Sequence, residues 1–167
     1  DDLIRDLSAQ YTYKGLTELV NTTDAMVSAV MDGPRSCMSG SFNIMCTDGV
    51  RRHPYAVYAP ELGWGMVVRR ENDAVLGRCL VWQSKDGTEK FFVRSYKRER
   101  DERSHSGMDE AIEAWLKERG FVKRHGWPTG TPLLRLETSR GEYLMPYIDG
   151  DTQQVSSDDF FIDDCGD

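Results

Sequence analysis

The chain has 167 residues, of which 39% are hydrophobic and 29% are charged, and its formal net charge is −7 at pH 7. This length fits a single domain with a hydrophobic core of its own. No apolar run approaches the roughly 18 residues that a membrane-spanning helix needs, and the first residues show no signal-peptide pattern. The composition therefore favours a globular domain with no membrane partner and excludes a fibrous protein.

The excess negative charge lies at the C-terminal end. Residues 149–167 contain seven Asp and no Glu, Lys or Arg, so the other acidic residues balance the 21 basic ones. We predict one domain over residues 1–148 and an acidic tail over 149–167, and partial order of that tail stays open as an alternative. Such a tail is typical of a solubilising or disordered segment, with a docking strip for a basic partner as the alternative. The acidic balance disfavours general affinity for nucleic acid.

The cysteines and histidines are scattered along the chain. Cys37, Cys46, Cys79 and Cys165 form no C-x-x-C pair, and the histidines lack the spacing of metal ligands. We therefore expect neither a metal site nor a disulfide framework. Reduced cysteines indicate an intracellular protein.

Two segments have the hydrophobic spacing of amphipathic helices. The first covers about residues 15–31 and ends at the Gly-Pro pair of positions 33–34. The second begins near Ser106, with Asp109 three residues later as in a capping box, and ends at Gly120. We therefore predict two main helices, one on each side of the central part of the chain.

Several segments are rich in β-branched and aromatic residues, which predicts strands. Four lie between the helices: YAVYA (55–59), GMVVRR (65–70), AVLGRCLVWQ (74–83) and KFFVRSY (90–96). Turn residues such as Asn72-Asp73 separate them and indicate an antiparallel meander. A C-terminal hairpin follows the second helix, from PLLRLE (132–137) and EYLMPYI (142–148). These elements predict an α+β fold: a twisted, mostly antiparallel sheet, made of the meander plus the C-terminal hairpin, with two main helices packed on it.

The loop GPRSCMSG (33–40) contains a candidate catalytic thiol. Cys37 lies two residues after Arg35, and His53 follows in a later loop as a candidate base, a pairing that can activate a thiolate. Cys37 also follows the C-terminal end of a predicted helix, where the helix dipole disfavours an anion. A structural turn and a binding loop are therefore the alternatives for this segment, and we favour a function other than catalysis.

Alternation along two predicted strands brings arginine and aromatic residues to one face of the sheet. Arg78, Leu80 and Trp82 share a face in GRCLVW, and Phe92, Arg94 and Tyr96 share one in FFVRSY. If these strands pair, they form an exposed surface with the composition of binding hot spots. The predicted binding residues are Arg35 and Ser36 at its rim and Arg78, Trp82, Arg94 and Tyr96 on the sheet. The alternative is that a helix covers this face and the arginines pair with carboxylates.

The stretches GPRSCMSG, HPYAVYA, GRCLVW, FFVRSY and YLMPYIDG resemble a family of uncharacterised proteins encoded by tailed bacteriophages, from about Met31 to Gly150. The resemblance implies a phage-encoded accessory protein in the cytoplasm of the infected bacterial host. We expect such a protein to bind a host or phage macromolecule, as host-takeover and anti-defence proteins do, without a cofactor. The expected partner is a protein; a nucleic acid would need a local basic and aromatic surface.

The order of elements is also similar to that of GNAT-type N-acetyltransferases. In that family, a strand leads into a glycine-rich turn and a helix N-terminus that holds the pyrophosphate of acetyl-CoA. The corresponding residues here are Arg103, Ser106 and Gly107, in a turn with one glycine and a different register. A divergent GNAT-like acyltransferase that uses acetyl-CoA is therefore the alternative function.

Overall fold

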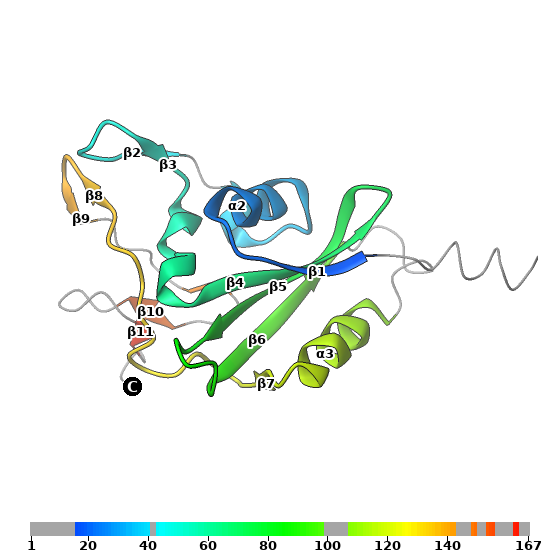
Figure 1. Cartoon of the computed structure of the whole chain (residues 1–167). Coiled ribbons are helices and arrows are strands. Elements are labelled where there is room, and N and C mark those ends of the chain that lie inside the picture. Colours follow the sequence, from blue (N-terminus) through cyan, green and yellow to red (C-terminus); the bar gives the residue numbers. More distant parts are fainter. Residues whose placement is uncertain are drawn as a thin grey trace, which may run out of the picture.

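The computed structural model describes residues 16–40, 43–98, 107–142, 148–149, 153–155 and 162–163. A five-stranded sheet forms the centre of this part, with helix α2 (Thr23–Asp32) on one face and helix α3 (Met108–Glu118) on the other (Figure 1). The predicted α+β class with a mostly antiparallel sheet is therefore confirmed.

The central sheet has the strand order β1-β4-β5-β6-β7, with bounds β1 Leu16–Val20, β4 Trp64–Glu71, β5 Ala74–Gln83, β6 Lys90–Lys97 and β7 Val122–Lys123. Neighbouring strands pair antiparallel except β6 and β7, which are parallel and are connected through α3. Asn72 and Asp73 join β4 to β5 with positive φ angles of 48° and 66°, as a type I′ hairpin turn requires. The three long predicted strands of the meander are thus confirmed.

Separate hydrophobic clusters cover the two faces of this sheet. Met26 and Val30 of α2 are buried against one face, and Ile112 and Leu116 of α3 are buried against the other. Burial of each such side chain contributes about 1.5–3 kcal/mol to the stability of the folded protein. Gly77 allows α3 to approach β5, since a Cβ there would lie 2.7 Å from the Ile112 side chain.

The predicted first helix is wrong over its N-terminal part. Residues 16–20 form the strand β1, and α2 begins at Thr23, where the Thr22 side chain caps it by accepting a hydrogen bond from the Ala25 amide (3.3 Å). The apolar residues of β1 have helical spacing, but the segment pairs with β4 along its whole length. Pairing with a neighbouring strand outweighs a local pattern of this length.

The segment YAVYA is also not a strand. Residues Pro54–Val57 form the 3₁₀ helix η2, which is buried throughout. Pro54 occupies the first helical position, and His53 caps the turn by accepting a hydrogen bond from the Tyr55 amide at Nδ1 (3.1 Å). A short segment buried on all sides has no period that distinguishes strand from helix, so composition alone gave the wrong element.

Helix α3 ends as predicted but begins differently. Gly107, with φ of 84°, is its N-cap, and no side chain caps the helix there. The predicted capping box is wrong, because Asp109 accepts a hydrogen bond from Ser95 on β6 instead (2.8 Å); Ser106 lies outside the described residues. At the C-terminal end, the amides of Gly120 and Phe121 bond back to the last turn, which is the predicted glycine motif.

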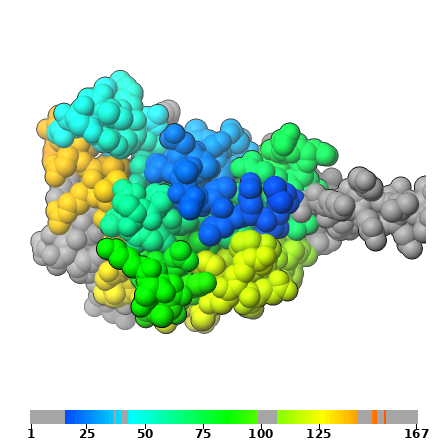
Figure 2. All heavy atoms as spheres, in the orientation of Figure 1, coloured from blue at the N-terminus to red at the C-terminus, as the bar shows by residue number. Residues whose placement is uncertain are grey.

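Short hairpins extend the fold beyond the central sheet: β2 (Ile44–Met45) with β3 (Arg51–Arg52), β8 (Glu137–Thr138) with β9 (Gly141–Glu142), and β10 (Gln154–Val155) with β11 (Ile162–Asp163). Cys46 and Thr138 form a bridge between the first two hairpins, which lie together at one end of the molecule (Figure 2). The predicted C-terminal hairpin is present as β8–β9, with much shorter strands in the described part; residues 143–147 lie outside it. No helix of the described residues is long and apolar enough to cross a membrane.

Candidate functional site

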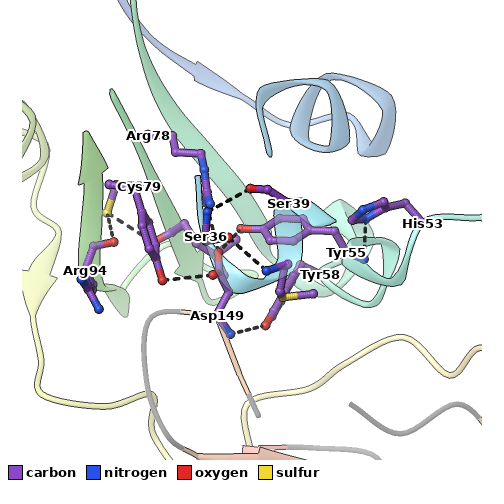
Figure 3. Close-up of polar contacts among 12 residues, drawn as sticks. Ser36, Ser39, His53, Tyr55, Tyr58, Arg78, Cys79, Arg94 and Asp149 are labelled. Carbon is purple, nitrogen blue, oxygen red and sulfur yellow. Dashed lines mark hydrogen bonds and ion pairs between the residues drawn. The ribbon is translucent and has the colours of Figure 1, made fainter. Parts of the chain in front are cut away.

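A buried polar cluster surrounds Asp149, between β5, β6 and η2 (Figure 3). Arg78 Nη1 lies 3.0 Å from Asp149 Oδ2, and both side chains are 0% exposed. The Tyr55 hydroxyl donates to the same oxygen (3.0 Å), and the Tyr96 hydroxyl donates to Oδ1 (3.1 Å). The Asp149 amide donates to the Tyr58 hydroxyl (2.8 Å). One carboxylate therefore joins the C-terminal segment to the sheet and to η2.

Arg78 is thus a core residue, and its predicted exposure is wrong. The prediction that Arg78 and Trp82 share one face of β5 agrees with the packing, but that face is covered by η2 and by Asp149. The alternative interpretation, in which the arginine pairs with a carboxylate, holds for Arg78. The tyrosines of the cluster are affected as well: burial, together with the charge of Asp149, raises the pKa values of Tyr55 and Tyr96.

An irregularity in β6 changes which of its residues share a face. The register shifts between Cys79 and Val81 of β5: Cys79 is paired with Ser95, but Val81, two residues later, is paired with Phe92, three residues earlier. As a result, Phe92 packs on the α3 side of the sheet, whereas Tyr96 reaches Asp149 on the other side. The expectation that these two aromatic residues share a face is therefore wrong, since an extra residue reverses the alternation.

Four of the six predicted binding residues line one surface hollow of about 530 Å³, which we call the cationic hollow; they are Arg35, Ser36, Arg94 and Tyr96. Its walls come from the loop after α2, from the C-terminal half of β6, from α3 and from β7. A second hollow of about 490 Å³ shares Arg35 with it. The structure thus brings residues 35–36 and 94–96 together, as the sequence predicted.

The charges in the cationic hollow are only partly compensated. Lys97 pairs with Asp109 at 3.3 Å, and Lys123 pairs with Glu113 at 2.6 Å. Arg35 and Arg94 form no ion pair with any carboxylate of the described residues. Arg94 is exposed, and its guanidinium lies over the Tyr96 ring, with Cζ 5.1 Å from the ring centre. Two guanidinium groups are therefore free to bind an anion.

Trp82 lies away from this hollow, so the predicted single surface is divided. Its indole Nε1 donates to the Leu62 carbonyl (2.8 Å), and its ring stacks on Phe91 with centres 6.1 Å apart. Trp82 lines a smaller hollow of about 270 Å³. There the Arg124 guanidinium covers the Phe91 ring, with Cζ 4.2 Å from the ring centre. The grouping of Trp82 with Arg94 and Tyr96 is therefore wrong.

The catalytic and cofactor candidates occupy structural positions where they are described. Cys37 begins the 3₁₀ helix η1 (Cys37–Gly40), in agreement with a structural turn, and the His53 ring nitrogen Nδ1 is used as a cap. A different cysteine, Cys79 of β5, is buried; burial raises the pKa of its thiol, which disfavours a thiolate. Of the predicted acetyl-CoA turn, Gly107 is described and Arg103 and Ser106 are not. Within the described residues, no three His, Cys, Asp or Glu side chains are grouped as metal ligands.

His53 makes a prediction about stability and pH. Burial lowers its pKa below the ordinary value of 6.5, so the unfolded chain takes up the proton more readily than the folded protein. Neutral His53 therefore makes its full contribution to the free energy of unfolding above pH 6.5, and this contribution is lost as the pH falls below 6.5. We expect the free energy of unfolding to decrease between about pH 7 and about pH 5. In the variant His53→Asn, which keeps a side-chain acceptor, urea titrations should show a flatter dependence; equal slopes would contradict this.

Asp149 is the important residue that the sequence interpretation missed, because it assigned this residue to the acidic tail. Asp149 and Gln153 are both buried, so the predicted boundary at position 149 falls within packed structure. A signal was present: an arginine inside the apolar strand GRCLVW requires a buried carboxylate. The pattern did not indicate which of the acidic residues supplies it.

Comparison with known proteins adds no relative to this picture. No family model, no curated protein and no solved structure matches the chain. The candidate function therefore depends on the cationic hollow and the buried cluster beneath it.

Proposed function

We propose that this protein is an accessory binding protein that engages an acidic segment of a protein partner through the cationic hollow. The observation that supports this most directly is the pair of guanidinium groups, Arg35 and Arg94, that lack carboxylate partners in the described part and lie at the same hollow. Arginine and tyrosine are enriched among the residues that dominate binding energies at protein interfaces.

The composition of the molecule favours a protein partner over a nucleic acid. The chain carries a net charge of −7, and a polyanion would be repelled by it beyond the immediate hollow. The hollow, at about 530 Å³, is large enough for one or two side chains of a docked segment. The partner is therefore a protein that presents a local acidic group to Arg35 and Arg94.

The setting that we propose is a bacterial cell infected by a phage. It depends on the resemblance of segments such as GPRSCMSG and GRCLVW to proteins of tailed phages. Residues 35 and 36, which line the cationic hollow, belong to the first of these segments. A host protein or another phage protein is the corresponding partner, as for host-takeover and anti-defence proteins.

The alternative is a divergent acyltransferase with acetyl-CoA as cofactor. In its favour, Gly107 precedes α3 with a positive φ, and β6, α3 and the parallel strand β7 follow one another as a strand-helix-strand unit. Calorimetric titration with acetyl-CoA distinguishes the two functions, since saturable heat would favour the acyltransferase.

Charge reversal at the cationic hollow tests the binding function. We expect wild-type protein to capture one specific protein from bacterial lysate, and the double variant R35E/R94E to lose it, because attraction becomes repulsion. The matched control R51E/R140E makes the same change in net charge at exposed arginines of other hairpins and should still capture the partner. Capture of the same protein by R35E/R94E, or the absence of a specific protein, would overturn the proposal.

A further inference from the structure

The buried arginine beneath the cationic hollow has unused hydrogen-bond donors. Arg78 is 0% exposed and bonds to Asp149 through Nη1, while its Nε and Nη2 have no hydrogen-bond partner among the described residues. A guanidinium group carries five N–H donors, and buried donors without partners are costly. The Asp149 carboxylate therefore balances the charge of Arg78, but the N–H donors on Nε and Nη2 are left without a partner in the described part of the chain.

The Arg78 guanidinium lies behind the wall of the hollow that Tyr96 forms. Arg78 on β5 and Tyr96 on β6 are partners in the sheet register, and Arg78 Cζ lies 4.4 Å from the centre of the Tyr96 ring. The same ring lines the hollow and is contacted by Arg94 at 5.1 Å. Tyr96 is thus in contact with a buried guanidinium, whose charge Asp149 balances, and with the exposed guanidinium of Arg94, which raises the positive potential of the hollow.

The loop after α2 adds further hydrogen-bond donors to the hollow. Arg35 and Ser36 follow α2 and line the same hollow. Ser36 Oγ accepts a hydrogen bond from the Met38 amide (3.3 Å), so its own hydroxyl proton is available to a ligand. An anion in the hollow would therefore meet Arg94 on one side and Arg35 with Ser36 on the other.

We infer that the cationic hollow is a binding site for a phosphoryl group, held by Arg35, Ser36 and Arg94, with the Tyr96 wall fixed from behind by Arg78. A phosphoryl group carries a charge of about −1.5 to −2 and three acceptor oxygens, which matches two unpaired guanidinium groups on separate walls. A carboxylate, with one charge and two oxygens in a plane, would satisfy one of them. This inference rests on the proposed function and specifies the anionic group that the partner presents.

The same chemistry has two sources, a phosphorylated side chain of the protein partner and a phosphorylated small molecule. Calorimetry on the full chain with inorganic phosphate, a short phosphoserine peptide and acetate tests the site and distinguishes the sources. We expect saturable phosphate binding with acetate much weaker. The variants R35A and R94A should each bind phosphate about tenfold more weakly. A peptide that binds more tightly than phosphate supports both the site and a phosphorylated protein partner. Equal affinities support the site with a small phosphorylated molecule as its ligand and count against the proposed protein partner.

The control variant is R51A, which removes an exposed arginine on β3 and should leave phosphate affinity unchanged. Absence of phosphate binding, equal weakening by R51A, or tighter binding of a single-stranded oligonucleotide than of the peptide would overturn the inference. If phosphate fails to bind while R35E/R94E still abolishes capture of the protein partner, the phosphoryl site is wrong and the proposed function stands. If phosphate fails to bind and R35E/R94E still captures the protein partner, both the phosphoryl site and the proposed function are wrong.

Discussion

Replacing Asp149 with alanine is expected to destabilise the protein by about 3–5 kcal/mol, because it leaves the Arg78 cation buried without a counter-charge. The hydroxyls of Tyr55 and Tyr96 would lose their acceptor in the same step. A loss of this size is a large part of the total stability of a domain. Urea titration followed by circular dichroism measures it as a decrease in the free energy of unfolding.

A double-mutant cycle separates the ion pair from general damage at this site. Arg78→Met alone should also be strongly destabilising, since it leaves the Asp149 carboxylate buried with tyrosine donors as its hydrogen-bond partners in the cluster. The double variant R78M/D149L removes both charges and should cost less than the sum of the single changes, because neither charge is left unpaired. Additive losses, or a loss below about 1 kcal/mol for Asp149→Ala, would contradict the structural role of the pair.

Replacing Gly63 with alanine is expected to destabilise the protein by about 3 kcal/mol. Gly63 ends the 3₁₀ helix η3 (Pro60–Leu62) with φ of 102°, a conformation that disfavours any side chain. A Cβ there would also press on the backbone carbonyl of Gln83 and lie 2.8 Å from Trp82 Nε1. The backbone at the end of β5 cannot move away without breaking its pairing with β4. Thermal and urea denaturation measure the loss.

Gly141 provides the matched control for that substitution. It has nearly the same φ, 106°, at the turn of the β8–β9 hairpin, but a Cβ there would meet no atom within 4 Å. Gly141→Ala should therefore cost about 1 kcal/mol, the backbone strain alone. Similar losses at the two positions would show that the close approach to Gln83 is unimportant.

The buried position of Asp149 changes how the acidic C-terminal residues should be studied. Deletion of residues 149–167 would remove the counter-charge of Arg78 and the buried Gln153 side chain together with the other acidic residues. Loss of partner binding in that deletion would report unfolding rather than docking. Substitution of acidic residues after position 155, which leaves both buried groups in place, separates the two effects.

The sequence predicted the central part of the fold because local signals and tertiary structure agree there. The segments of β4, β5 and β6 are rich in β-branched residues, and turn residues such as Asn72-Asp73 separate them. The predicted bounds of each strand agree with those of the structure to within a residue or two. The errors fall where a neighbouring element decides the outcome. Residues 16–20 became a strand by pairing with β4, and residues 54–57 became a 3₁₀ helix in a position buried on all sides.

The candidate site was predicted in part. Arg35, Ser36, Arg94 and Tyr96 were grouped from alternation and loop position, and they do line one hollow. Strand alternation gave the correct side of the sheet for Arg78 and Trp82 but not for Phe92, where a register shift intervenes, and it does not tell which side chains a distant segment covers. Asp149, whose position cannot be derived from local pattern, is what makes Arg78 a buried residue rather than an exposed one.

Arginine side-chain NMR during titration with inorganic phosphate shows directly whether the cationic hollow binds an anion. Saturable shifts of the guanidinium signals of Arg35 and Arg94, with smaller changes at exposed Arg51, are the predicted result, since the first two arginines lie at the hollow and lack carboxylate partners in the described part. Shifts of equal size at all three arginines, or no saturable shift at Arg35 and Arg94, would contradict it.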